Sequence, residues 1–301
     1  MPFRVRTVLC VLACALAAMI AAPTAQSAEP AFTVATYNTH HAQGVDDRLD
    51  LERIALEIER TGASVIGLQE VDRHWSSRSE FADQAQWLAT RLKMDVAYGA
   101  NLDLEPTTAS GGERRQYGTA VLSKFRIRES RNTLLPRPQN GEQRGLLEAV
   151  FKVQGATVRF ANTHLQHNSA VERAAQAHRI AELLEASREP VILVGDLNAR
   201  PDAPELTPLF ERYDDAWTEG GAGDGFTYPA ESPNARIDYV LVSPEIAVSN
   251  ATVLSTLASD HLPLTADVTV PRPHGGAGSR ARSEGQERTM ILHPRRSSSV
   301  G

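Results

Sequence analysis

Short segments of alternating or continuous apolar residues recur along this chain, and each runs into turn residues such as Gly, Asn or Asp. This pattern is typical of strands that are at least half buried. We expect strands at 32–37, 64–68, 117–122, 146–153, 157–162, 190–194, 236–242, 247–254 and 264–270. The segments 146–153 and 157–162 are separated only by a turn at Gln154 and Gly155, so they predict a hairpin.

Fewer segments have the spacing of an amphipathic helix. Leu51, Ile54 and Ile58 recur on one helical face after Asp50, a predicted N-cap, and before Gly62. A second helix is expected at about 82–92, with Trp87, Leu88 and Leu92 directed inward. A third begins at a capping box of Ser169 and Glu172, and a short helix lies near 205–210. Helices separate only some of the strands, which predicts an α/β fold of two stacked sheets with outer helices, in one domain.

The first 28 residues have the pattern of a secretory signal rather than of the domain. Arg4 and Arg6 precede an apolar run, and small residues follow it at Ala25, Ser27 and Ala28. We expect cleavage near Ser27 or Ala28 and a secreted protein, with an uncleaved anchor as the alternative. The only two cysteines, Cys10 and Cys14, lie within this segment. The mature chain would therefore use neither thiol catalysis nor thiolate metal ligands.

Residues 271–301 are rich in Arg, Ser and Gly and lack apolar periodicity, so we expect a disordered basic tail. Such a tail is either a solvated extension or a contact for an anionic surface. Two Arg fall in 1–28, and six Arg and two Glu fall in 271–301. This leaves 23 Lys and Arg against 35 Asp and Glu in 29–270, a net charge of −12. That sign disfavours a protein whose affinity depends on neutralising many nucleic-acid phosphates.

Polar side chains that bind metals or move protons gather where the predicted strands end. The strand 190–194 runs into Gly195, Asp196, Leu197 and Asn198. Similar groups occur in YNTH (37–40), LQE (68–70), NTHLQH (162–167), RIDYVLVS (236–243) and SDH (259–261). Turn chemistry alone explains any one of these, but their recurrence predicts a single site along one edge of the sheets.

These motifs carry a family resemblance. TYN, LQE, YGTAVLS, NTHL, GDLNA, RIDYVLVS and SDHLPL, in this order over residues 32–270, resemble the endonuclease/exonuclease/phosphatase superfamily, which includes deoxyribonuclease I, exonuclease III and neutral sphingomyelinases. The resemblance implies a four-layer α/β/β/α sandwich of two mainly antiparallel sheets with outer helices. It also implies that residues 29–270 form a catalytic domain that hydrolyses a phosphate ester with a divalent cation.

The resemblance further implies metal ligands at matched positions. Glu70 resembles the main ligand, Asn38 its neighbour, and Asp260 a further carboxylate on the metal side. Oxygen ligands of this kind suit a hard cation, so Mg²⁺ is expected, with Mn²⁺ or Ca²⁺ as alternatives.

The matched catalytic positions are Asp196, Asn198, His261, Asp238 and His164. Asp196 and Asn198 resemble the pair that handles the attacking water, and His164 resembles a histidine that contacts the phosphate. Asp238 resembles the carboxylate that orients His261, the catalytic histidine. Which of Asp196 and His261 is the general base stays open.

Candidate substrate contacts are His40, Arg73, Arg144 and His167. The arginines could clamp a phosphate, and surface ion pairs explain them nearly as well. His40 and His41 are adjacent, so on a strand they would point to opposite faces and could not chelate one ion. One of the two could still reach the substrate. No third ligand at a diagnostic spacing joins His164 and His167, so zinc is not expected there.

The motifs indicate the branch of the superfamily less clearly than they indicate the superfamily itself. SPNARIDYV lacks the Trp and Asp-Arg of inositol polyphosphate phosphatases, and His164 stands where abasic-site nucleases have Tyr. YNTHH, LQEVDR and NTHLQH most resemble uncharacterised hydrolases related to sphingomyelinases and glycolipid-anchor remodelling proteins. We therefore expect a monomeric secreted phosphodiesterase for a lipid head group or small diester. The alternatives are a secreted nuclease and a non-catalytic binding module.

Overall fold

Two six-stranded sheets pack face to face in the computed structural model, which describes residues 28–272. The predicted signal and basic tail lie outside these residues, apart from the few at their inner ends. The first sheet has the order β11-β12-β1-β2-β4-β3. Its strands are β1 (Ala31–Asn38), β2 (Val65–Arg73), β3 (Asp95–Leu104), β4 (Arg115–Ser123), β11 (Ala247–Val253) and β12 (Leu264–Thr269). Only β1 and β2 pair in parallel, and the other neighbours are antiparallel.

The second sheet has the order β5-β6-β7-β8-β10-β9. Its strands are β5 (Ile127–Leu134), β6 (Gly145–Val153), β7 (Ala156–His164), β8 (Val191–Asp196), β9 (Asp214–Asp215) and β10 (Asp238–Val242). Here β7 and β8 are the parallel pair. Apolar side chains from the inner faces of both sheets, among them Val34, Val121, Phe160 and Val194, form one buried cluster between them.

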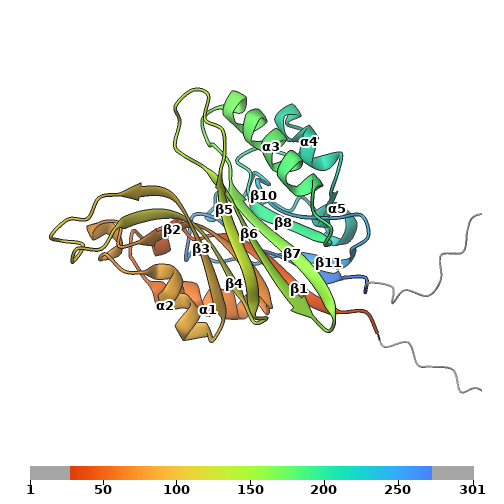
Figure 1. The fold of residues 1–301 in the computed structure, drawn as a ribbon, viewed down its shortest axis with the longest axis horizontal. Coiled ribbons are helices and arrows are strands. Elements are labelled where there is room, and N and C mark those ends of the chain that lie inside the picture. The colour runs from red at the N-terminus through yellow and green to blue at the C-terminus, as the bar shows by residue number, and fades with distance from the viewer. Residues whose placement is uncertain (1–27, 273–301) are drawn as a thin grey trace, which may run out of the picture.

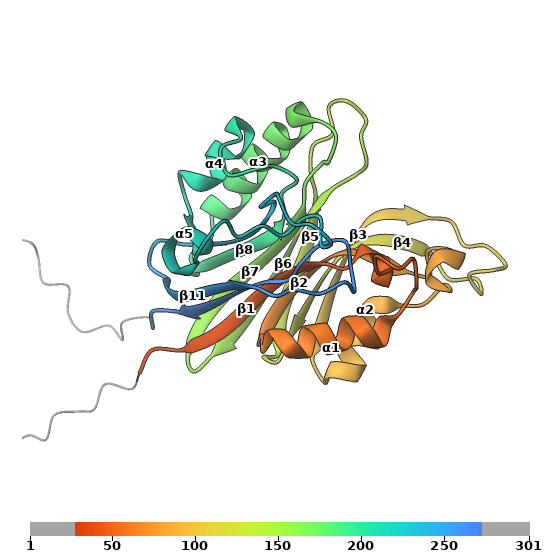
Figure 2. The ribbon, with the colours of Figure 1, turned by 180° about the vertical axis from the view of Figure 1, so that it is seen from behind.

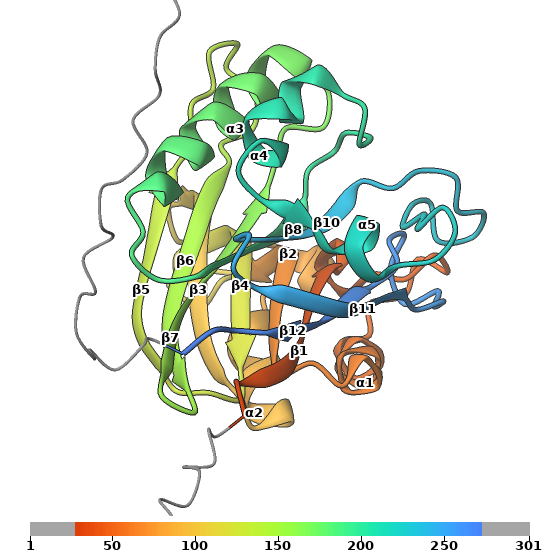
Figure 3. The ribbon, with the colours of Figure 1, turned by 90° about the vertical axis from the view of Figure 1, so that its right-hand side faces the viewer.

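Helices cover the two outer faces and complete the four layers (Figures 1 and 3). α1 (Leu51–Thr61) and α2 (Gln84–Leu92) lie on the first sheet, and α3 (Ala170–Glu185) and α4 (Thr207–Phe210) lie on the second. The short α5 (Ala216–Gly220) contacts β11. The predicted four-layer α/β/β/α sandwich is confirmed. No helix within residues 28–272 is long and apolar enough to cross a membrane.

The predicted helix ends are also present. The carboxylate of Asp50 accepts a hydrogen bond from the backbone N–H of Arg53 at 2.8 Å, and Gly62 ends α1 with φ of 67°. The Ser169 hydroxyl accepts from the backbone N–H of Glu172 at 3.2 Å. These side chains satisfy N–H groups that a helix leaves unpaired in its first turn.

Several features differ from the sequence prediction, among them β9 and α5, which lie in a segment expected to be a loop with one short helix near 205–210. Strands β3 and β5 were not predicted, because β3 buries small or polar residues and β5 is a polar edge strand. The expected loop 102–115 is shorter, and it spans 105–114 between β3 and β4, which project together from the body (Figure 2). The inward position predicted for Trp87 is wrong. Its side chain is 38% exposed, because Ala85, Leu88 and Ala89 form the buried face of α2.

A buried amide ties the two sheets together close to their shared edge. Nδ2 of Asn162, on β7, donates to the carbonyls of Leu68 at 2.9 Å and Ala120 at 2.8 Å, both in the other sheet. Its Oδ1 accepts from Nε2 of Gln69 at 2.7 Å. Asn162 is fully buried, so none of these groups can turn to water instead.

Asn162→Ala is therefore expected to lower the free energy of unfolding by about 2–4 kcal/mol, because it leaves the buried Gln69 amide and two carbonyls without this partner. Urea unfolding of purified protein measures the change. Asn250→Ala is the matched control, since Asn250 is exposed and makes one long bond of 3.3 Å to Asp267. If both variants lost the same free energy of unfolding, the hydrogen bonds of Asn162 between the sheets would not contribute to stability.

Candidate active site

Strand ends from both sheets meet at one edge of the sandwich. Asn38 ends β1, while His164 and Asp196 end the parallel pair β7 and β8 and lie opposite each other in register. Asp238 begins the antiparallel β10 and pairs with Asp196. The two sheets touch here through Nδ2 of Asn38, which donates to Oδ2 of Asp196 at 3.0 Å.

These strand ends open into a polar cleft of ≈ 220 Å³. Its lining residues are Glu70, Arg144, His164, His167, Asp196, Asn198, Tyr228, Ile237, Asp260 and His261. All but Tyr228 and Ile237 were singled out from the sequence. Tyr228 lies in the loop before β10, where no periodic pattern marks it, yet its ring packs 4.7 Å from that of His261.

Asp196 is the centre of the cleft. Its Oδ2 lies 3.5 Å from Nε2 of His164 and 3.6 Å from Nε2 of His261, and its Oδ1 accepts from the backbone N–H of Asn198 at 2.9 Å. Burial raises the pKa of Asp196 to about 7, against the opposing effect of the positive charge on His261. Near neutral pH this carboxylate can therefore accept a proton.

His261 is paired to a second buried carboxylate. Its Nδ1 lies 2.9 Å from Oδ2 of Asp238. Burial would lower the pKa of His261, but the charges of Asp238 and Asp196 outweigh it and raise that pKa to about 10. The imidazole is thus charged at neutral pH. The three groups lie close enough for a metal ion, but the proton on His261 already neutralises part of their charge.

His164 has the opposite electrostatic setting. Nη1 of the buried Arg144 donates to its Nδ1 at 3.1 Å, which leaves the proton on Nε2, facing Asp196. Burial and the charge of Arg144 hold the pKa of His164 well below its usual range. His164 is therefore a neutral hydrogen-bond donor. Arg144 itself pairs with Glu142 at 2.8 Å and is 3% exposed, so it is not a surface arginine.

The carboxylates predicted to bind a metal lie on the other side of Asp196. Glu70 sits at an irregularity of β2, with φ of 59°, and its Oε1 accepts from Nδ2 of Asn38 at 3.1 Å. The Asn38 amide therefore bridges Glu70 and Asp196, and its Oδ1 accepts from the backbone N–H of His40. Asp260 lines the same cleft. The half-buried carboxylates of Glu70 and Asp260 are oxygen donors of the kind that suits a hard divalent cation.

Two candidate substrate contacts lie outside the lining of the cleft. Nε of Arg73 forms an ion pair with Asp83 at 3.0 Å, and its guanidinium lies over the ring of Tyr98. A surface ion pair thus accounts for Arg73. His40 also does not line the cleft, although its Nδ1 lies 3.9 Å from Asp260. His167 does line it, with Nδ1 3.5 Å from Nη2 of Arg144.

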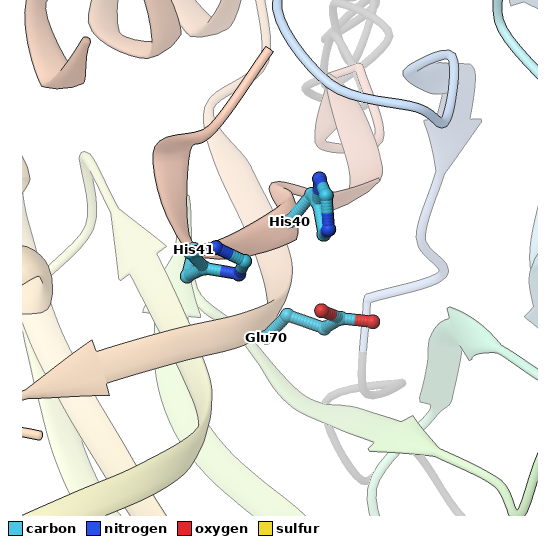
Figure 4. A group of neighbouring side chains, drawn as sticks. All are labelled: His40, His41 and Glu70. Atoms are coloured by element: carbon cyan, nitrogen blue, oxygen red, sulfur yellow. The ribbon is translucent and has the colours of Figure 1, made fainter. Parts of the chain in front are cut away.

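The prediction that His40 and His41 point to opposite faces is wrong. The chain leaves its extended conformation after β1, and both residues lie in a short turn, η1 (His40–Ala42), each with φ of 45°. Their rings are 4.5 Å apart between centroids. A ring nitrogen of each histidine and a carboxylate oxygen of Glu70 lie within 4.8 Å of one another (Figure 4).

Solved structures share this architecture. An endonuclease/exonuclease/phosphatase from Beutenbergia cavernae is 27% identical, with a TM-score of 0.67 over 80% of this chain and 72% of that one. A mannosyl-6-phosphatase from Bacteroides thetaiotaomicron is 21% identical, with a TM-score of 0.64 over 79% of this chain and 99% of its own. At that identity the second likeness concerns the fold alone.

Sequence comparison agrees with the structures. Protein cwh43 of Schizosaccharomyces pombe is 29% identical over 170 residues, which are 56% of this chain but only 16% of that much longer protein. Residues 35–261 match the Endonuclease/Exonuclease/phosphatase family, and they include every strand-end motif of the cleft. The chain therefore belongs to this family, whose members are hydrolases that act on phosphate esters.

Proposed function

We propose that this protein is a secreted, divalent-cation-dependent phosphodiesterase that hydrolyses a lipid head group or another small phosphodiester. The observation that carries the proposal is the buried Asp196, with a pKa of about 7, between the charged His261 and the neutral His164. A phosphodiester anion resists attack by water, so a site for its hydrolysis needs a base together with groups that offset negative charge.

Each of these residues has a distinct part in the proposed reaction. Asp196 takes a proton from the attacking water, because it is partly ionised at neutral pH and fixed by the N–H of Asn198. His261 presents a charged N–H toward the phosphate and gives a proton to the leaving alcohol oxygen as its bond to phosphorus breaks, while Asp238 keeps the imidazole oriented. His164 is neutral, so its Nε2–H can donate a hydrogen bond to a phosphate oxygen without adding a positive charge. In the resting site that hydrogen faces Asp196.

Glu70 and Asp260 are the residues that would hold the cation, with Asn38 fixing the position of Glu70. Members of this family are typically dependent on a divalent metal. When bound, such a cation neutralises charge on the phosphate oxygens. The identity of Mg²⁺ as the working ion is part of the proposal, based on the hard oxygen donors of these two carboxylates.

Two features favour a small diester over a nucleic acid. The cleft of ≈ 220 Å³ is of a size to take a phosphate with a small head group. The net charge of −12 in 29–270 repels a polyanion. Secretion rests on the signal-like pattern of residues 1–28, and the kinship to sphingomyelinases and glycolipid-anchor remodelling proteins rests on the motifs YNTHH, LQEVDR and NTHLQH.

Asp238→Asn is expected to lower the pKa of His261 by at least one unit from about 10, because it removes the nearest carboxylate while burial still disfavours the charged ring. The parent ring should stay charged from pH 6 to about 9, and the variant ring should lose its proton within that range. NMR titration of the imidazole C–H signals in metal-free protein measures both values. An unchanged pKa would mean that Asp238 does not sustain the charge.

The substrate class is tested by initial rates of the purified mature protein with Mg²⁺ at near-physiological salt. We expect bis-p-nitrophenyl phosphate and a sphingomyelin or phosphatidylinositol head group to be cleaved faster than duplex DNA, because the acidic domain gains nothing by counterion release. Faster cleavage of DNA would favour a nuclease. Faster cleavage of p-nitrophenyl phosphate would favour a monoesterase.

Glu70→Gln provides the metal control in the same assay. It is expected to lose activity by about 10²-fold or more, because it removes the charge of the main proposed ligand while keeping the size of the side chain. Glu211→Gln, which changes an exposed glutamate outside the cleft, should keep the parent rate. Equal turnover of Glu70→Gln and the parent in saturating Mg²⁺ would remove Glu70 from the site.

A further inference from the structure

We propose that His40, His41 and Glu70 form a binding site for a borderline divalent transition metal, of which Zn²⁺ is the example tested below. This site adjoins the phosphate-ester cleft and shares Glu70 with it. The inference goes beyond the proposed hydrolysis, because a metal can bind here whether or not a phosphate ester is cleaved. Four observations support it: the backbone, the hydrogen bonds behind the rings, the unpartnered ligand atoms and the donor set.

The backbone brings the three side chains together in an uncommon conformation. His40 and His41 both have φ of 45°, and Glu70 has φ of 59°. Residues other than glycine are uncommon in this left-handed region, so the surrounding structure has to hold the turn in place. Nε2 of Gln84 donates to the carbonyl of His41 at 2.7 Å and helps to hold the turn. The consequence is that both rings face Glu70 (Figure 4).

One residue, Gln43, hydrogen-bonds to one ring nitrogen of each histidine and so fixes the orientation of both rings. Its backbone carbonyl lies 3.2 Å from Nδ1 of His40, and its side-chain Oε1 lies 3.1 Å from Nε2 of His41. Its own Nε2 donates to Asp47 at 2.9 Å, so the amide cannot turn without losing this bond. Both oxygens of Gln43 are acceptors. The two imidazoles must therefore carry their hydrogens on the bonded nitrogens.

The lone pairs then lie on Nε2 of His40 and Nδ1 of His41. Among residues 28–272 no protein group hydrogen-bonds to these two nitrogens or to Oε2 of Glu70. His41 is only 6% exposed, and its Nδ1 is buried without a partner. A buried acceptor without a partner is unfavourable, and a bound cation would provide the missing partner.

The donor set indicates the class of metal. Two neutral imidazoles and one carboxylate are the ligands of open zinc sites, where a fourth position is left for water or substrate. Imidazole nitrogens favour borderline ions, whereas Mg²⁺ prefers oxygen. One ring nitrogen of each histidine and one carboxylate oxygen of Glu70 lie within 4.8 Å of one another, whereas a tetrahedral metal at about 2.0 Å from each needs separations of about 3.3 Å.

Hydrogen bonds from the second nitrogen of a ligating histidine to an oxygen acceptor are the usual support of such sites. Gln43 provides this support to both histidines. The nearby cation Arg78 does not occupy the site, because its guanidinium forms two bonds to Asp72, at 2.9 and 2.8 Å.

The test is direct metal binding to the full mature chain, stripped of metal with a chelator and studied without substrate. Titration with Zn²⁺ against a chromophoric chelator should give one tight equivalent, and bound Co²⁺ should give the visible absorption bands of a nitrogen- and oxygen-ligated ion. His40→Gln and His41→Gln should each weaken Zn²⁺ binding by at least about 10-fold. Gln43→Leu should weaken it by about 10- to 100-fold through loss of the supporting bonds.

His178→Gln is the matched control, because His178 is an exposed histidine on α3, away from Glu70, and pairs with Glu182. It should bind Zn²⁺ as the parent does, and thermal unfolding should show that all variants are folded. Zn²⁺ affinity unchanged in either His40→Gln or His41→Gln would overturn the site. The site would also be overturned if Mg²⁺ displaced bound Zn²⁺ at an equal concentration. Zn²⁺ binding without any hydrolase activity would instead count against the proposed function alone.

Discussion

The contact between Asp196 and His261, at the junction of the two sheets, is the interaction on which the arrangement of this molecule depends. Two carboxylates and one imidazolium are buried together, with Asp196 1% exposed and Asp238 fully buried. An unpaired charge at this depth would be strongly unfavourable. The positive charge of His261 between Asp238 and Asp196 lowers that cost, and Asp196 still keeps a pKa of about 7. The charge of His261 therefore stabilises the buried carboxylates, while burial keeps the pKa of Asp196 high enough for it to act as a base.

The sandwich positions this cluster because each sheet contains one parallel pair. In the first sheet β1 ends where it pairs with Gln69 of β2, next to Glu70, and in the second sheet β7 and β8 end together at His164 and Asp196. Asn38 joins the two edges by donating to Glu70 and Asp196. Beneath that link, Asn162 joins the sheets again through the backbone of β2 and β4. The cleft residues are thus held from both sides by hydrogen bonds between sheets.

Much of this site could be predicted from the sequence, because strand-end motifs such as GDLN and SDH are local and their order is distinctive. The helices with clear N-caps, at Asp50 and Ser169, could also be predicted. Strands β3 and β5 were not, since their polar faces lack the apolar alternation that marks a strand. Trp87 was misplaced because the buried face of α2 contains Ala85, Leu88 and Ala89 rather than the largest side chain of the helix.

The convergence of His40 and His41 could not be predicted for a different reason. Alternation along a strand holds only while the backbone stays extended, and here three consecutive residues with positive φ, His40 to Ala42, follow shortly after β1. Nothing in the letters YNTHH signals that turn, because His is not a residue that favours it as strongly as Gly does. Tyr228 was also missed. It reaches His261 only through the path of a long loop, which local patterns do not encode.

The central claim is that Asp196 acts on the attacking water rather than serving only to hold the neighbouring histidines. The most direct measurement is kcat for Asp196→Asn on a small phosphodiester, together with the inhibition constant of a non-hydrolysable phosphate analogue. The account predicts that kcat falls by about 10²- to 10⁴-fold, the range for loss of a general base, while analogue binding changes only a few-fold. Turnover within about threefold of the parent, with the fold intact, would contradict it.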